Sequence, residues 1–167
     1  TSLSALLACV APASAAVTAS APDGFTIEHR VVAPVPPAEA WARLVRLSQW
    51  WEGSHSYSGD AANLSIDPRA GGCWCEQLPT GGSVEHARVI QAVPGRLLRA
   101  SGGFGPLQSE PVAAVLTVTL RPVAAGTEIA MRYAVSGPLP GGAQAFSGPV
   151  DSVLTTQFDR LAQVNAR

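Results

Sequence analysis

The chain has 167 residues, of which 47% are hydrophobic and 14% charged, so it has enough apolar side chains to build the core of one ordinary domain. Its formal net charge is −1, and its 11 basic residues are all arginines spread along the sequence. Proteins that bind nucleic acid need a basic face that neutralises phosphates. The scattered arginines therefore exclude nucleic acid as an expected partner.

The start of the sequence has the features of an export signal. Residues 1–22 contain no charged side chain, and within them the apolar stretch 3–10 precedes the small-residue run 13–16. This order is typical of the hydrophobic region and the A-x-A cleavage site of a secretory signal peptide. The stretch is shorter than the ~20 apolar residues of a transmembrane helix. We therefore expect a signal peptide and spacer over 1–22, a folded domain over 23–167, and a protein that is periplasmic or secreted.

Two other interpretations of this segment stay open. Leu6-Leu7-Ala8-Cys9 approximates a bacterial lipobox, in which the cysteine becomes a lipid-modified N-terminus. Leucine is a weaker match in the second position, and the A-x-A site competes with it, so lipoprotein anchoring through Cys9 is the lesser alternative. The segment could also be a disordered alanine-rich tail.

The folded part begins with a strand and two short helices. Apolar and polar side chains alternate over 25–33, which predicts a half-buried strand. Proline is favoured in the first turn of a helix, so Pro37 predicts a helix over 37–46 that carries Trp41. A second short helical piece, 47–51, ends in Trp50 and Trp51.

The middle of the chain predicts short antiparallel strands. Apolar and β-branched stretches alternate with Gly- and Pro-containing breaks of a few residues, and such breaks are typical of hairpin turns. The expected strands are 63–67, 72–78, 83–93, 96–102, 112–122 and 127–136.

A long helix is expected to end the domain. Gly148 is its predicted N-cap and Pro149 its first residue, and an apolar stripe that includes Phe158 continues to Val164. These elements predict an α+β domain with a curved antiparallel sheet of about six or seven strands, which covers the C-terminal helix with one face. We expect a cavity between the sheet and this helix.

The ordered elements resemble the START-like helix-grip superfamily, also called SRPBCC. The branch that they resemble is named after the activator of the heat-shock-protein ATPase. The resemblance extends from Phe25 to Val164 and depends on four segments in this order: 33–41, 47–51, 67–72 and 89–98. It implies a sheet that grips the C-terminal helix around a hydrophobic cavity, but it implies no shared reaction, because members include ligand carriers, cyclases, dehydratases and co-chaperones. The apparent signal peptide argues against a cytosolic heat-shock partner.

Cys73 and Cys75 lie on one face of a strand, where their Cα atoms would be about 6.6 Å apart. That is near the outer limit for a disulfide, so a bond would need strain or a bulge. With a four-residue turn at 79–82, His86 would lie opposite Cys75, and two thiolates and a histidine could bind a metal. A disulfide, a metal site and two buried thiols all remain open, and we predict neither a metal nor a cofactor.

The candidate ligand-binding residues are those that the strands and helices could turn into the cavity. His29 lies on the apolar face of the first strand and could be a cavity anchor or a core histidine bonded to a neighbour. One of Trp50 and Trp51 is expected at the surface, beside the cavity mouth, because adjacent helical residues do not share a face. His55 could lie at the rim of the entrance. The full set is His29, Trp50, Trp51, Trp74, Glu76, His86, Phe104, Arg132 and Phe158.

The sequence contains no GxSxG, HExxH or Walker motif. We therefore expect an exported protein, monomer or homodimer, that binds a small hydrophobic molecule or lipid in this cavity and has no assigned catalytic residue. Two alternatives stay open. One is an enzyme of cyclase, dehydratase or hydrolase type that uses polar residues of the cavity, and the other is a co-chaperone-like protein-interaction module.

Overall fold

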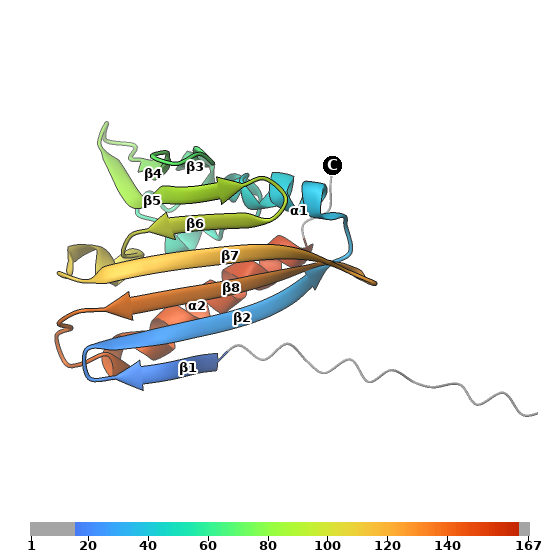
Figure 1. Cartoon of the computed structure of the whole chain (residues 1–167). Helices are drawn as coiled ribbons and strands as arrows, with labels where there is room; N and C mark the ends of the chain where they lie inside the picture. Colours follow the sequence, from blue (N-terminus) through green and yellow to red (C-terminus); the bar gives the residue numbers. More distant parts are fainter. Residues whose placement is uncertain (1–15, 164–167) are drawn as a thin grey trace, which may run out of the picture.

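Eight antiparallel strands form one curved sheet in the computed structural model, which describes residues 16–163 (Figure 1). The strands follow the order β1-β2-β8-β7-β6-β5-β4-β3 across the sheet. Their bounds are β1 Ala16–Ala21, β2 Gly24–Ala33, β3 Leu64–Ile66, β4 Cys73–Gln77, β5 Ser83–Val93, β6 Leu97–Ser101, β7 Ala113–Val123 and β8 Gly126–Ser136.

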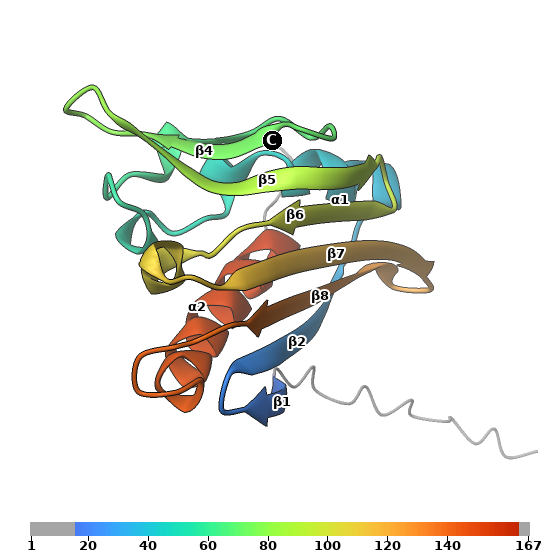
Figure 2. The ribbon, with the colours of Figure 1, turned by 60° about the vertical axis from the view of Figure 1, so that its left-hand side comes forward.

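Within residues 16–163, two α-helices and four short 3₁₀ helices accompany the sheet. The α-helices are α1, Pro37–Leu44, and α2, Gln144–Gln163. The 3₁₀ helices are η1 Leu47–Gln49, η2 Gly53–His55, η3 Ala61–Asn63 and η4 Gly105–Ser109. Figures 1 and 2 show α2 lying across one face of the sheet, which is the helix-grip arrangement.

The predicted fold class and strands are confirmed, with one strand more than the six or seven expected. The additional strand, β1, comes from a segment that the sequence analysis treats as spacer, and it pairs with β2 at the sheet edge. Most of the expected export signal, residues 1–15 with Cys9, lies outside the described residues. Among residues 16–163, no helix is long and apolar enough to cross a membrane.

The start of α2 differs from the prediction. The helix begins at Gln144 rather than at Pro149, so Gly148 is not an N-cap. Pro149 lies inside the helix, in its second turn, and because proline lacks an N–H it cannot donate the usual hydrogen bond to the carbonyl oxygen of Ala145. The backbone N–H of Ser147 donates to the carbonyl oxygen of Ala143 and closes the first turn. Val164, the predicted end, lies outside the described residues.

The core lies between α2 and the inner face of the sheet. The predicted stripe of α2 is buried, including Val150, Leu154 and Phe158. It packs against inward side chains of the sheet, among them Ile27 on β2 and Tyr133 on β8. Alternate residues of β2 and β8 are buried, as period-two strands with one covered face require.

Candidate functional site

A β-bulge between β4 and β5 sets the orientation of His86. Trp74 pairs with Ala87 and Cys75 pairs with Glu85, which leaves His86 without a partner of its own on β4. Such a bulge inserts one extra residue and locally breaks the alternation of side chains. His86 and Ala87 are consequently both buried, whereas Glu85 is exposed. The bulge therefore turns a histidine toward the inner side of the sheet.

Gly102, directly after β6, allows the backbone there to lie close to this bulge. A Cβ atom at Gly102 would lie 2.3 Å from the carbonyl oxygen of His86 and 2.6 Å from the Cα atom of Ala87. Both are backbone atoms, so a larger residue would displace β5 itself. The sequence predicts Gly102 as the last residue of a strand, and the structure shows that close packing beside His86 requires a glycine there.

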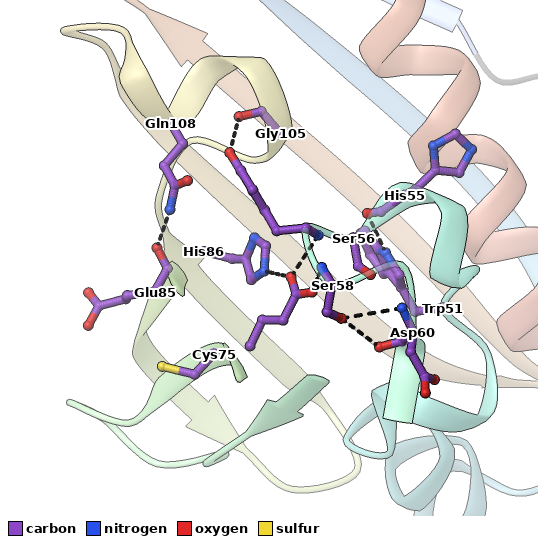
Figure 3. Close-up of polar contacts among 12 residues, drawn as sticks. Trp51, His55, Ser56, Ser58, Asp60, Cys75, Glu85, His86, Gly105 and Gln108 are labelled. Carbon is purple, nitrogen blue, oxygen red and sulfur yellow. Dashed lines mark hydrogen bonds and ion pairs between the residues drawn. The ribbon is translucent and has the colours of Figure 1, made fainter. Parts of the chain in front are cut away.

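His86 forms a buried pair with Glu76 of β4 (Figure 3). The distance between His86 Nε2 and Glu76 Oε2 is 2.8 Å. The backbone N–H of Tyr57 donates to the same carboxylate oxygen over 3.1 Å, and the backbone N–H of Ser58 donates to Oε1. Glu76 has no exposed surface. The segment after η2 therefore satisfies a carboxylate that would otherwise be buried without partners.

These hydrogen bonds keep Glu76 ionised. Burial by itself raises the pKa of the carboxyl group, but hydrogen bonds from Ser58, Tyr57 and His86 stabilise the charged form. The hydrogen bonds outweigh burial and lower the pKa of Glu76 from 4.5 to about 2. At neutral pH the group is thus a carboxylate that can only accept hydrogen bonds.

A pocket of about 420 Å³ opens beside this pair. Its wall is mostly apolar, and no Asp, Glu, Lys or Arg is among the described residues that line it. Helix α2 supplies one side, and η4 and the segment around η2 supply the others. The lining residues are Trp51, His55, Ser56, Tyr57, His86, Phe104, Gly105, Pro106, Ser109, Pro149, Val150, Val153 and Leu154.

Hydrogen bonds connect the segments around the pocket. The hydroxyl of Tyr57 donates to the carbonyl oxygen of Gly105 over 3.2 Å, which joins the η2 segment to η4 (Figure 3). Beneath Phe104, the buried hydroxyl of Tyr133 accepts the Phe104 N–H and donates to the carbonyl oxygen of Gly102. Burial raises the pKa of Tyr133, although the Phe104 N–H opposes this, so its hydroxyl stays protonated.

The predicted aromatic residues divide between the pocket and the core. Trp51 and Phe104 line the pocket. Trp50, Trp74 and Phe158 lie in the core behind it and are not among its described lining residues. The expectation that Trp50 or Trp51 is exposed is wrong, because η1 ends at Gln49 and the following backbone leaves helical geometry, so both rings turn inward.

His29 and Arg132 lie away from the pocket. His29 is buried between β2 and α2, where its Nε2 is 2.8 Å from Asp159 Oδ1. This is the arrangement expected of a core histidine bonded to a neighbour. The Arg132 side chain is 54% exposed on the outer face, 3.5 Å from Glu28 Oε1. Glu76 faces inward as a support for His86, and His55 lies at the pocket wall with its side chain 40% exposed.

Cys73 and Cys75 form a disulfide, with their Cα atoms 5.3 Å apart. Two residues along a regular strand would be separated by about 6.6 Å, so β4 is shortened opposite the extra residue of β5. His86 lies on the inner face, whereas both cysteines lie on the outer face beside Glu85 and Arg88. The predicted pairing of His86 with Cys75 is therefore wrong by one residue. The three side chains do not meet, and the described residues contain no cluster of three potential metal ligands.

Several residues of the site were not predicted. Tyr57 and Ser58 act through backbone N–H groups, which leave no mark in side-chain patterns. Val150 and Leu154 belong to the apolar stripe of the C-terminal helix, and the stripe alone does not indicate that they face the pocket. A usable signal for the first pair was the polar, glycine-bounded loop at 53–59.

The sequence matches a known protein family. The model of the family described as activator of Hsp90 ATPase homolog 1-like protein matches residues 36–165. The chain belongs to this family. The match contains α1, the sheet from β3 to β8 and α2, and therefore the whole pocket. The predicted SRPBCC resemblance is confirmed, and the fold of the family is consistent with a ligand-binding or interaction module.

Solved structures share the fold of this Hsp90-activator-like domain. An uncharacterised protein from Rhizobium leguminosarum aligns with a TM-score of 0.63 and 19% identity, covering 87% of this chain and 96% of that one. CalU16 from Micromonospora echinospora aligns with a TM-score of 0.61 and 17% identity, covering 91% and 83%. A Mesorhizobium loti protein aligns with a TM-score of 0.58 and 21% identity, covering 83% and 95%. No curated protein matches the chain.

Proposed function

We propose that this protein binds a small, mostly apolar molecule in the pocket between α2, η4 and the segment around η2. The observation that carries the proposal is the pocket itself, about 420 Å³ in volume and walled mainly by aromatic, proline and aliphatic side chains. Ligand pockets usually measure roughly 300–1,000 Å³ and combine an apolar wall with a few polar groups. A volume near the lower end suits a molecule of one or two rings rather than a long lipid chain.

Filling the pocket should abolish binding. Val153 lies on α2, lines the pocket and is partly exposed, so Val153→Trp would place an indole ring in the space of the ligand. Native mass spectrometry of wild-type protein purified from its own host should detect a retained small molecule. We expect at least tenfold less of it on the Val153→Trp protein.

Val32→Trp is the matched control, because Val32 is 47% exposed on the outer face of β2. This variant should retain the molecule at the wild-type level. Repeated recovery of empty wild-type protein, or equal retention by Val153→Trp, would contradict the proposed function.

The His86–Glu76 pair favours a second candidate, an enzyme that moves a proton on a bound molecule. A histidine held by a carboxylate at a pocket wall has the composition of a general acid–base pair. The two candidates differ in what the purified protein holds. If the wild type and His86→Phe retain the same molecule, the protein is a binder. If His86→Phe accumulates a precursor that the wild type has converted, it is an enzyme.

We also propose that the protein is exported. The uncharged, apolar segment at the start of the sequence supports this, and a disulfide such as Cys73–Cys75 is typical of oxidising compartments. Expressed in bacteria with residues 1–22 intact, the protein is expected in the periplasmic fraction. Cys73 and Cys75, the two cysteines outside residues 1–22, should react with maleimide only after reduction. Recovery in the cytoplasm with free thiols would count against export.

A further inference from the structure

The polar contact that the pocket offers to a ligand can be derived from the hydrogen bonds of His86. Its Nε2 is directed at Glu76, and Figure 3 shows the second ring nitrogen, Nδ1, free of any dashed line. Among the described residues, none forms a hydrogen bond with Nδ1, and the ring lines the pocket. Nδ1 is therefore the atom of this pair that a ligand can reach.

The surroundings of Glu76 determine which ring nitrogen carries the proton. Its carboxylate already accepts the N–H groups of Tyr57 and Ser58 and has no hydrogen to donate. A contact of 2.8 Å to His86 Nε2 then requires the proton on Nε2. In its neutral form the ring consequently presents a lone pair at Nδ1, which accepts a hydrogen bond.

The charges around the pocket disfavour an acidic ligand. The carboxylate of Glu76 lies directly behind His86, and no Lys or Arg is among the described residues of the wall. An anion bound at Nδ1 would approach a buried negative charge without a compensating cation. The polar group of the ligand should therefore be neutral and should donate a hydrogen bond.

The other walls favour a flat ring. Trp51, Tyr57 and Phe104 bring three aromatic rings to the pocket, and Phe104 lies nearly parallel to the His86 ring, at 12°. Aromatic side chains pack well against flat apolar molecules. Pro106 and Pro149 add rigid apolar surface on the sides formed by η4 and α2.

We infer that the ligand is a neutral aromatic compound of one or two rings whose hydroxyl or N–H group donates a hydrogen bond to His86 Nδ1. This inference rests on the ligand-binding function proposed above and specifies the chemical class of the ligand. It makes His86 a specificity-determining residue, and Glu76 the positioning residue that holds the required tautomer.

Isothermal titration with four matched probes tests the inference: β-naphthol, its methyl ether, naphthalene and β-naphthoate. A hydrogen bond in a partly buried site contributes up to about tenfold in affinity. β-Naphthol should therefore bind the wild type about tenfold more tightly than its methyl ether, and β-naphthoate no more tightly than naphthalene. In His86→Phe, the preference for the hydroxyl should fall to about one, while naphthalene still binds.

Each other outcome has a defined meaning. Equal binding of β-naphthol and its ether by the wild type, or tightest binding of β-naphthoate, would overturn the inference but leave the proposed function intact. Failure of all four probes to bind would contradict both. His55→Phe tests the other histidine of the wall as the rival acceptor. If His55→Phe lost the preference for β-naphthol over its methyl ether while His86→Phe kept it, the assignment to His86 would be wrong.

A measurement without substitution keeps the inference testable if His86→Phe does not fold. Nitrogen NMR of the wild-type protein, at a pH where the ring is neutral, distinguishes the two imidazole tautomers. We expect the proton on Nε2 and an unprotonated Nδ1 that shifts when β-naphthol binds. A proton on Nδ1 would refute the inference, because the ring would then donate rather than accept.

Discussion

Replacement of Trp50 with alanine should lower the free energy of unfolding by about 3–5 kcal/mol, the usual cost of truncating a large buried aromatic side chain. Trp50 has no exposed surface. Its ring centroid lies 5.5 Å from that of Trp51, 5.7 Å from that of Phe158 and 6.4 Å from that of Trp74. Its indole N–H donates to the carbonyl oxygen of Leu44, at the end of α1. One side chain thus joins α1, β4 and α2.

Urea unfolding at equilibrium, followed by circular dichroism, measures this loss. Trp41→Ala is the matched control, because Trp41 carries the same side chain on α1 but is only partly buried. It should cost clearly less than Trp50→Ala, since less apolar surface and a smaller cavity are involved. Equal costs for the two variants would show that Trp50 is not the central contact of the core.

The strands could be predicted from the sequence because their signals are local. Alternating burial and short Gly- or Pro-containing turns determine where a strand begins and ends, and the expected 83–93 is β5 without change. The start of α2 was harder to predict, because Pro149 and Gly148 are typical of a helix start. The helix nevertheless begins at Gln144, and Ser147, in the turn before Pro149, is buried and donates its N–H to the carbonyl oxygen of Ala143.

The site was predicted less completely, because it depends on one residue of register. Glu76 and His86 were both expected as candidates, yet a regular pairing would have placed His86 against Cys75. The bulge moves His86 to the inner face, and the Cys73–Cys75 disulfide shortens the strand opposite it. Neither feature leaves a periodic signal, since a bulge is a local break in alternation.

The contacts of Glu76 show a second reason why the site was predicted less completely than the strands. A buried carboxylate in a strand is normally disfavoured unless it is paired, so the side chain pattern alone suggests the solvated face. The N–H groups of Tyr57 and Ser58 reverse this preference. They belong to a loop about twenty residues away, and backbone groups have no side-chain identity that a sequence could display.

Glu76 should also make the stability of the protein strongly dependent on pH in the acid range. The pKa of its carboxyl group is about 2 in the folded protein, against 4.5 for the ordinary group. Because the folded pKa is depressed, the stabilisation is fully present above about pH 4.5 and is lost as the pH falls toward 2. At 1.36 kcal/mol per pKa unit the whole effect is about 3 kcal/mol, of which about 2 kcal/mol should be lost by about pH 3.

Glu76→Gln isolates this contribution, because an amide of the same shape does not titrate. The NH₂ group of the glutamine would face one of the two backbone N–H groups that the carboxylate accepts. At neutral pH we expect the free energy of unfolding of Glu76→Gln to be about 3 kcal/mol lower than that of the wild type. Between about pH 5 and pH 3 the wild type should lose about 2 kcal/mol more than the variant does. Glu85→Gln, on the outer face of the adjacent strand, removes a surface ion pair with Arg88 and should leave the acid dependence nearly unchanged. Urea unfolding of all three proteins across this range is the measurement. If Glu76→Gln followed the wild-type pH profile, the carboxylate would not be the ionised, hydrogen-bonded support of His86 on which the tautomer depends.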